Sequence, residues 1–101
     1  MQEQLRREMV ELFLAAKDPR DMETLIEGLL TPQEIEGVVF RWRLMARLLR
    51  GQTQREIGKE LGVSLGKIAR GSRLLQFGPP AFREMVARLD RQITAKESRN
   101  P

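Results

Sequence analysis

The sequence has 101 residues, of which 41% are hydrophobic, so it has the length and apolar content of one domain with a modest core. It contains no cysteine and no histidine, which excludes disulfides, thiolate and imidazole metal sites, and catalysis by a nucleophile–histidine pair. The net charge of +4 is unevenly spread, because residues 1–38 hold four Lys/Arg and nine Asp/Glu, whereas residues 39–75 hold nine and two. A basic block in a chain that is acidic elsewhere is typical of a surface that meets phosphates, although a solvated helical face would have the same charge.

The residue types predict an all-α fold. Leucine, arginine, glutamate, methionine and alanine are plentiful, and these residues lose the least conformational freedom on entering a helix.

No apolar run approaches the roughly 20 residues that span a bilayer, and the mixed charges of the first residues are unlike a signal peptide. We therefore expect a cytoplasmic protein with no membrane partner.

Apolar residues at steps of three and four predict an amphipathic helix over residues 3–17; they are Leu5, Met9, Leu12, Phe13 and Ala16. Asp18 and Pro19 should end this helix and begin a short second one, because proline disfavours helix for the residue before it and is tolerated in a first turn. The inward residues expected of the second helix are Met22, Leu25, Ile26 and Leu29.

A capping box of Thr31 and Glu34, with Pro32 at the first helical position, predicts the start of a third and longest helix, which Gly51 should end. Its expected apolar stripe consists of Ile35, Val38, Val39, Trp42, Met45 and Leu49. A fourth helix is expected over residues 54–61, and Ser64 should cap a fifth whose inward residues are Leu65, Ile68, Ser72 and Leu75.

Gly78, Pro79 and Pro80 should end the fifth helix. A sixth helix is predicted from the spacing of Phe82, Met85, Val86, Leu89 and Ile93, and the last residues, 95–101, are expected to fray.

Many short helices and an apolar first helix with no obvious partner indicate that a second copy completes the fold, so we expect an obligate homodimer.

The fourth and fifth predicted helices have the pattern of a helix-turn-helix at about residues 54–75, within a single domain over residues 1–101. Gly58 is the small residue at the helix crossing, Gly62 is the turn glycine, and Val63 fills the turn. Gly71 departs from the pattern, because an apolar residue is usual there.

On the fifth helix, Lys67, Arg70 and Arg73 share an outward arc with Gly66, so backbone and cations could approach the major groove of duplex DNA. The candidate DNA-contacting residues are Gln54, Arg55, Lys59, Leu65, Gly66, Lys67, Ala69, Arg70, Ser72 and Arg73.

Four fragments in a fixed order resemble the tryptophan repressor family. They read Leu-Thr-Pro at residues 30–32, Leu-Leu-Arg-Gly at 48–51, Gln-Arg-Glu at 54–56 and Arg-Gly-Ser at 70–72. The resemblance implies a six-helix intertwined homodimer that represses transcription at double-stranded operator DNA, with L-tryptophan or a similar amino acid as a small-molecule corepressor and no prosthetic group.

By position, the resemblance implies that Arg41 lies along the bound indole, that Arg70 meets the ligand carboxylate, and that Leu30 and Thr31 lie near the amino group. Gly71 would line the pocket wall. The chain departs from the family's pattern at Lys67, Leu74 and Gly28, where the best-known members have Thr, Ser and Leu.

Each of these residues also has an explanation that needs no bound effector. Thr31 caps a helix, Arg41 can lay its stem on apolar surface, and Arg70 could contact only phosphate. Two other functions stay open, namely an effector-independent DNA-binding regulator of the same fold and a helical adaptor that binds RNA or protein. The carboxylates that could serve catalysis lie at cap and surface positions, so no enzyme and no catalytic or metal site is predicted.

Overall fold

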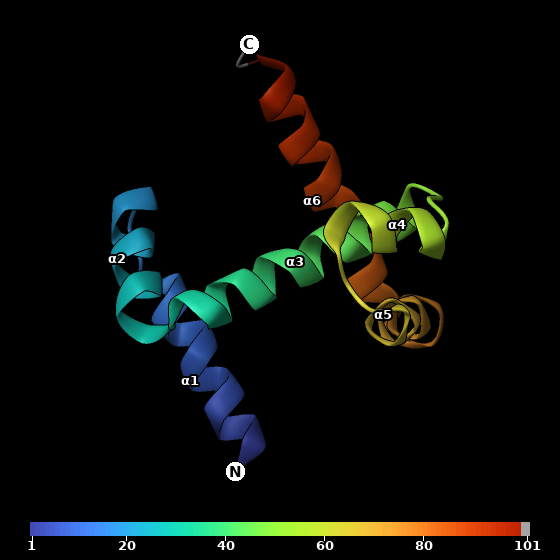
Figure 1. Ribbon diagram of the computed structural model, residues 1–101. Helices are drawn as coiled ribbons and strands as arrows, with labels where there is room; N and C mark the ends of the chain where they lie inside the picture. Colours follow the sequence, from blue (N-terminus) through green and yellow to red (C-terminus); the bar gives the residue numbers. More distant parts are fainter. Residues whose placement is uncertain (100–101) are drawn as a thin grey trace. The chain divides into compact units, whose positions relative to one another are not determined.

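The computed structural model describes residues 1–99, and in this part of the chain it contains six α-helices and no strand (Figure 1). The helices are α1 (Gln2–Leu14), α2 (Pro19–Leu29), α3 (Pro32–Leu49), α4 (Gln54–Leu61), α5 (Leu65–Phe77) and α6 (Pro80–Arg99). This order confirms the prediction of an all-helical chain. The residues group into an N-terminal unit, Met1–Gly37, and a C-terminal unit, Val38–Pro101. Each unit is described by itself.

The predicted helix starts are confirmed by side-chain caps. The Asp18 carboxylate accepts a hydrogen bond from the Asp21 backbone N–H at 2.8 Å, at the start of α2. At the start of α3, the Thr31 hydroxyl accepts from the Glu34 N–H at 3.1 Å and the Glu34 carboxylate accepts from the Thr31 N–H at 2.9 Å. These bonds satisfy N–H groups that have no partner inside a helix.

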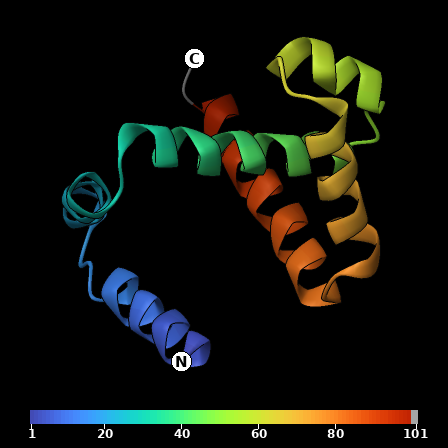
Figure 2. The same cartoon turned by 60° about the horizontal axis from the view of Figure 1, so that its bottom comes forward.

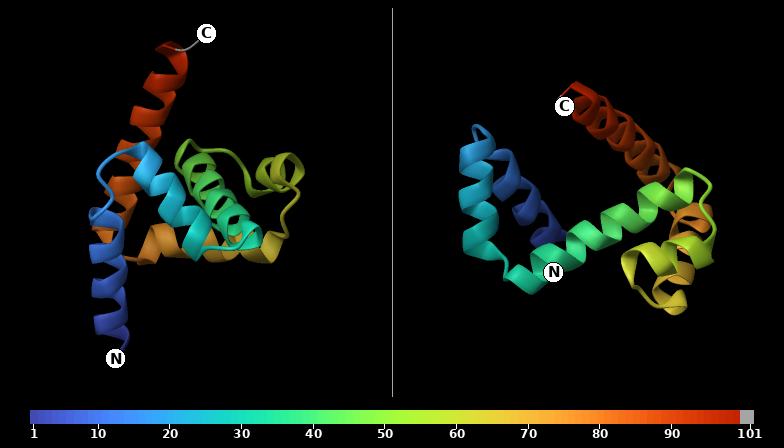
Figure 3. Two further views of the ribbon diagram at one scale, coloured as in Figure 1. Left: turned by 90° about the vertical axis from the view of Figure 1, so that its left-hand side faces the viewer. Right: turned by 45° about the horizontal axis from the view of Figure 1, so that its top comes forward.

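The N-terminal unit buries little of its apolar surface. None of the residues 1–37 is fully buried, and α1 exposes Leu5 by 56% and Met9 by 44%. Helix α1 ends at Leu14, earlier than the predicted Lys17, because the Lys17 N–H bonds to the Asp21 carboxylate at 3.0 Å instead of to a helical carbonyl. The short segment that joins α1 to α2 is visible in both views of Figure 3.

The C-terminal unit holds two clusters of buried side chains. Leu44, Ile57 and Ile68 form the first cluster, at which α3, α4 and α5 meet, and Ile57 and Ile68 are fully buried. The second cluster joins α3, α5 and α6 through Met45, Leu75 and Val86. In Figure 2, α5 and the first part of α6 lie side by side below α3, α6 then crosses α3, and α4 lies near the C-terminal end of α3. The end of α3 is therefore the common support of the three later helices.

This arrangement corrects the predicted stripe of the third helix. Val38 and Val39 are 56% and 38% exposed, whereas Leu44 and Ala46, which lie outside the predicted stripe, are buried. The end of α3 packs against α4 and α5 on one side and α6 on the other, so it buries a wider arc than one amphipathic face.

Helix α6 is longer and more exposed than predicted. It continues to Arg99, so the prediction of a frayed end is wrong for residues 95–99, where Ala95, Lys96 and Glu97 are good helix formers. Residues 100 and 101 lie outside the described part of the chain. Val86 is buried as predicted, but Met85 is 47% and Ile93 is 41% exposed.

Candidate nucleic-acid interface

Helices α4 and α5 are joined by the turn Gly62–Ser64, and local interactions fix both of their starts. Gly62 has φ +64, in the left-handed region that favours glycine, as predicted for the turn. The Ser64 hydroxyl accepts a hydrogen bond from the Lys67 N–H at 3.3 Å and caps α5. A second capping box begins α4, where Thr53 and Glu56 exchange hydrogen bonds of 3.1 and 3.2 Å. Sequence reasoning missed this box, although the Thr-x-x-Glu spacing was there to find it.

The buried sides of the two helices meet in the first cluster. Ile57 of α4 and Ile68 of α5 are fully buried there, and the space beside Gly58 is filled by Ile68, whose Cδ1 lies 3.5 Å from where a Cβ would stand. Gly71 is buried against α3, since an added Cβ would lie 3.1 Å from Cδ2 of Leu44. The absence of a larger residue at Gly71 therefore has a packing reason, which the sequence pattern alone did not give.

The opposite sides of α4 and α5 carry the candidate DNA-contacting residues. On α4, Gln54, Arg55 and Lys59 are exposed. On α5 the exposed candidates are Leu65, Gly66, Lys67, Ala69, Arg70 and Arg73, whereas Ser72 is half-buried. Leu65 was expected to face the core, and this expectation is wrong: Leu65 is 64% exposed, because it stands in the first turn of α5, one turn before Ile68 enters the cluster.

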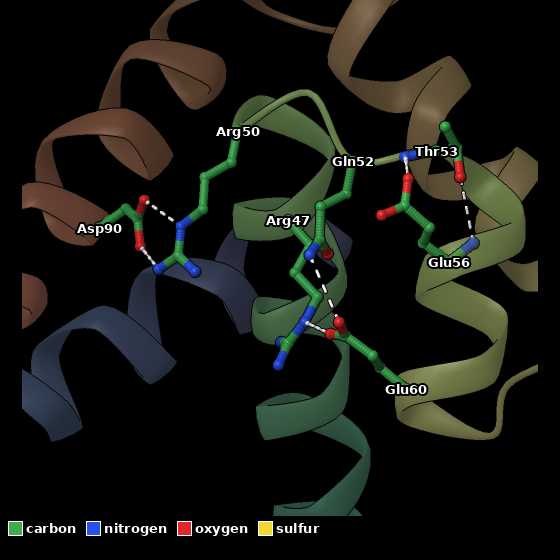
Figure 4. Close-up of polar contacts among 7 residues, drawn as sticks. All are labelled: Arg47, Arg50, Gln52, Thr53, Glu56, Glu60 and Asp90. Carbon is green, nitrogen blue, oxygen red and sulfur yellow. Dashed lines mark hydrogen bonds and ion pairs between the residues drawn. The ribbon is translucent and has the colours of Figure 1, made fainter.

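The charge on this face is positive because the acidic side chains near it are engaged. The sequence of α5 contains no Asp or Glu, and α4 contains two glutamates. Glu56 closes the capping box, and the Glu60 carboxylate accepts a hydrogen bond from Nε of Arg47 at 2.8 Å (Figure 4). The cations of α4 and α5 therefore meet little opposing charge on these two helices, which is the arrangement that phosphate recognition requires.

A second ion pair ties α3 to α6. Nε of Arg50 lies 3.0 Å from Oδ2 of Asp90, and Nη2 bonds to Oδ1, so the contact is bidentate. The hydrogen bond from Arg50 lowers the pKa of Asp90 below its ordinary value, against a smaller opposing effect of burial. Neither ion pair was predicted from the sequence, because a partner 13 or 40 residues away leaves no local pattern.

The candidate effector residues are divided between the two units. In the N-terminal unit Leu30 is half-buried, and the exposed Thr31 uses its hydroxyl to cap α3. In the C-terminal unit Arg41 and Arg70 are exposed on α3 and α5, and Gly71 is buried. Within residues 1–99, no ion pair engages Arg41 or Arg70. The guanidinium groups therefore face solvent.

The exposed basic helices and the six-helix order can be compared with known families. A family model described as Trp repressor protein matches residues 4–90, which is most of the chain. The chain belongs to the Trp repressor family. This result confirms the resemblance noted in the sequence.

Individual members of the Trp repressor family are about one third identical to this chain in sequence. A Trp operon repressor homolog of Vibrio parahaemolyticus is 33% identical over 88 residues, which cover 86% of this chain and 85% of the relative. A Trp operon repressor homolog of Chlamydia caviae is 35% identical over 86 residues, 84% of this chain and 85% of the relative. A Trp operon repressor homolog of Xylella fastidiosa is 35% identical over 75 residues, which cover 73% of this chain and 82% of the relative. The Trp repressor family is a family of regulators.

Among residues 1–99, no helix is long and apolar enough to cross a membrane.

Proposed function

We propose that this chain is a DNA-binding transcriptional repressor in which α4 and α5 form a helix-turn-helix, with α5 entering the major groove of operator DNA. The observation that carries the proposal is the exposed row of cations on two short helices whose other sides are anchored by Ile57 and Ile68. Membership of the Trp repressor family supports it independently.

The roles of the basic residues follow from where they lie. Arg55 and Lys59 on α4 contact phosphates and set the position of the protein on the duplex, while Lys67 and Arg73 on α5 stand where base edges and nearby phosphates come within reach. Gly66 and Ala69 leave the backbone of α5 bare between them, which allows a close approach.

The corepressor of the proposed repressor is L-tryptophan or a related indole or aromatic amino acid. Arg70 would serve both ligand and DNA, because its guanidinium could pair with the ligand carboxylate from the same helix that carries the proposed DNA contacts. Arg41 would stack on the aromatic ring, and Leu30, Thr31 and Gly71 are the other candidate ligand contacts.

The functional species is a homodimer, which we propose from the exposed apolar surface of the N-terminal unit. Leu5, Met9 and Leu12 of α1 are 56%, 44% and 39% exposed, although the apolar face of a helix in a globular protein normally packs against a core. A second copy related by a two-fold axis would cover this surface and present two α5 helices to a palindromic operator.

The proposal is tested by two measurements on the full chain. A duplex is selected from a random DNA pool by the protein in the presence of L-tryptophan, and its affinity is then measured with and without L-tryptophan at several salt concentrations. Binding that strengthens with L-tryptophan and falls steeply with salt supports the proposal. Selection of no duplex, or a flat salt response, contradicts DNA binding and favours the adaptor; affinity that ignores every amino acid tested favours the effector-independent regulator.

Two groups of variants separate DNA contacts from effector contacts. Replacing Arg55, Lys59, Lys67 or Arg73 by Ala should weaken DNA binding and leave the calorimetric affinity for L-tryptophan unchanged. Arg41→Ala should weaken L-tryptophan binding by about 1 kcal/mol or more, the value of a stacked cation. Arg70→Ala should weaken both. If Arg41→Ala and Arg70→Ala bind DNA like the wild type at every L-tryptophan concentration, the proposed pocket is wrong.

A further inference from the structure

The short helix α4 depends on its neighbours for its orientation. It has eight residues, and a helix of this length is not stable by itself in water. Ile57 is its one fully buried residue, and Leu61, one turn later, is partly buried against the same cluster. These apolar contacts hold the buried side of α4, and polar contacts at the border of that side can further restrict the rotation of the helix about its own axis.

Glu60, near the C-terminal end of α4, makes such polar contacts. Its Oε2 accepts a hydrogen bond from Nε of Arg47 at 2.8 Å, and its Oε1 lies 3.5 Å from the amide nitrogen of Gln52 (Figure 4). Arg47 belongs to the last turns of α3, and the Gln52 backbone N–H donates to the Arg47 carbonyl at 3.2 Å. Both carboxylate oxygens are thus held by the end of α3 and the turn that follows it.

The consequence for the proposed DNA-binding surface is geometric. Arg55 and Lys59 are four residues apart and share one side of α4, and Glu60 lies about 100° further around the helix from Lys59. A fixed Glu60 therefore fixes the direction in which Arg55 and Lys59 point.

We propose that Arg47 is a positioning residue for DNA binding: acting through Glu60, it sets the rotation of α4 and so aims Arg55 and Lys59 at the phosphates. This inference rests on the proposed function of the two helices. The competing explanation is electrostatic, in that Arg47 merely neutralises a glutamate that would repel DNA.

One substitution separates the two explanations, because they predict opposite changes in the affinity for DNA. Glu60→Ala removes a negative charge from the DNA-facing helix and replaces glutamate with a slightly better helix former, so electrostatics and helix propensity both predict tighter DNA binding. Positioning predicts weaker binding, by about two- to five-fold, the range expected for an exposed ion pair.

The chain offers a matched control. Arg50, directly after α3, and Asp90 form a second arginine–carboxylate pair, which joins the end of α3 to α6 and not to α4. Asp90→Ala removes one carboxylate, as Glu60→Ala does, and should leave the affinity for the selected duplex unchanged. Thermal unfolding of both variants shows whether either has lost its fold as a whole.

The experiment measures two quantities for the wild type, Arg47→Met, Glu60→Ala and Asp90→Ala: affinity for the selected duplex, and amide hydrogen exchange of α4 in the protein without DNA. We expect Glu60→Ala and Arg47→Met to bind DNA more weakly and to exchange α4 amides about two- to five-fold faster, with Asp90→Ala unchanged in both. Tighter binding by Glu60→Ala, or exchange in α4 equal to that of Asp90→Ala, would overturn the proposal. If the wild type binds no duplex, the proposed function fails, and exchange in α4 then decides the positioning role alone.

Discussion

The N-terminal and C-terminal units of this chain bury their apolar residues very differently. Residues 1–37 include no fully buried side chain, while the C-terminal unit forms two clusters around the end of α3. Their charges differ as well, since residues 1–37 hold four Lys/Arg and nine Asp/Glu, and the cations of α4 and α5 belong to the C-terminal unit. The two clusters give the cations of α4 and α5 a packed support, whereas the exposed apolar residues of α1 are the reason for proposing a second copy.

The largest effect expected is in the core of the C-terminal unit. Ile68 is fully buried between α3 and α4, so Ile68→Ala should lower the free energy of unfolding by about 2–5 kcal/mol. Leu65→Ala, one turn earlier on the same helix and 64% exposed, is the control and should change it by less than about 0.5 kcal/mol. Denaturant unfolding of both variants checks this, and equal losses would mean that the first cluster does not carry the stability of α5.

The next effect distinguishes two glycines of α5. Gly71→Val would place a side chain against Leu44, where a Cβ alone lies 3.1 Å from Cδ2, and overpacking should cost about 1–3 kcal/mol. Gly66→Ala meets only Oγ of Ser64, in ordinary contact at 4.0 Å, and should stabilise the helix by up to about 1 kcal/mol. The same unfolding experiment measures both; a stabilising Gly71→Val would show that α3 and α5 are not packed this closely.

The two capping boxes allow a comparison of the same interaction in the two units. Thr31→Ala and Thr53→Ala each leave an N–H without its acceptor and should each cost about 1 kcal/mol. Thr→Ser at either position keeps the hydroxyl and serves as the control. Thermal unfolding that responds to Thr53→Ala but not to Thr31→Ala would show that the start of α3 is not formed in solution.

The smallest effect is a pH dependence at the ion pair of α3 and α6. The hydrogen bond from Arg50 lowers the pKa of Asp90 in the folded protein, so its stabilisation is present above the unfolded pKa, near 4, and is lost as the pH falls through the folded value. Asp90→Asn should therefore be less stable than the wild type by up to about 1 kcal/mol at neutral pH, and the difference should shrink in acid. A difference that stays constant from neutral pH into acid would rule out this account of the pair.

Local signals predicted much of this structure, and contacts between distant residues account for what they missed. Capping by Asp18, Thr31 and Ser64 and the left-handed Gly62 follow from a few adjacent residues, and each was predictable. The burial of Leu44 and the need for Gly71 depend on three helices meeting at one point, which periodicity along one helix cannot reveal.

The candidate site, like the fold, was predictable from the sequence only in part. Exposure of the cations on α4 and α5 followed from helical geometry, whereas the two arginine–carboxylate pairs at the end of α3 required the fold. The DNA and effector roles of individual residues stay predictions.

The most direct test of this account is the state of association of the full chain, measured by sedimentation equilibrium with circular dichroism on the same samples. If the N-terminal unit needs a second copy, the protein sediments as a dimer while helical, loses helix as it dissociates on dilution, and has a thermal midpoint that rises with concentration. A compact, fully helical monomer at micromolar concentration would contradict it.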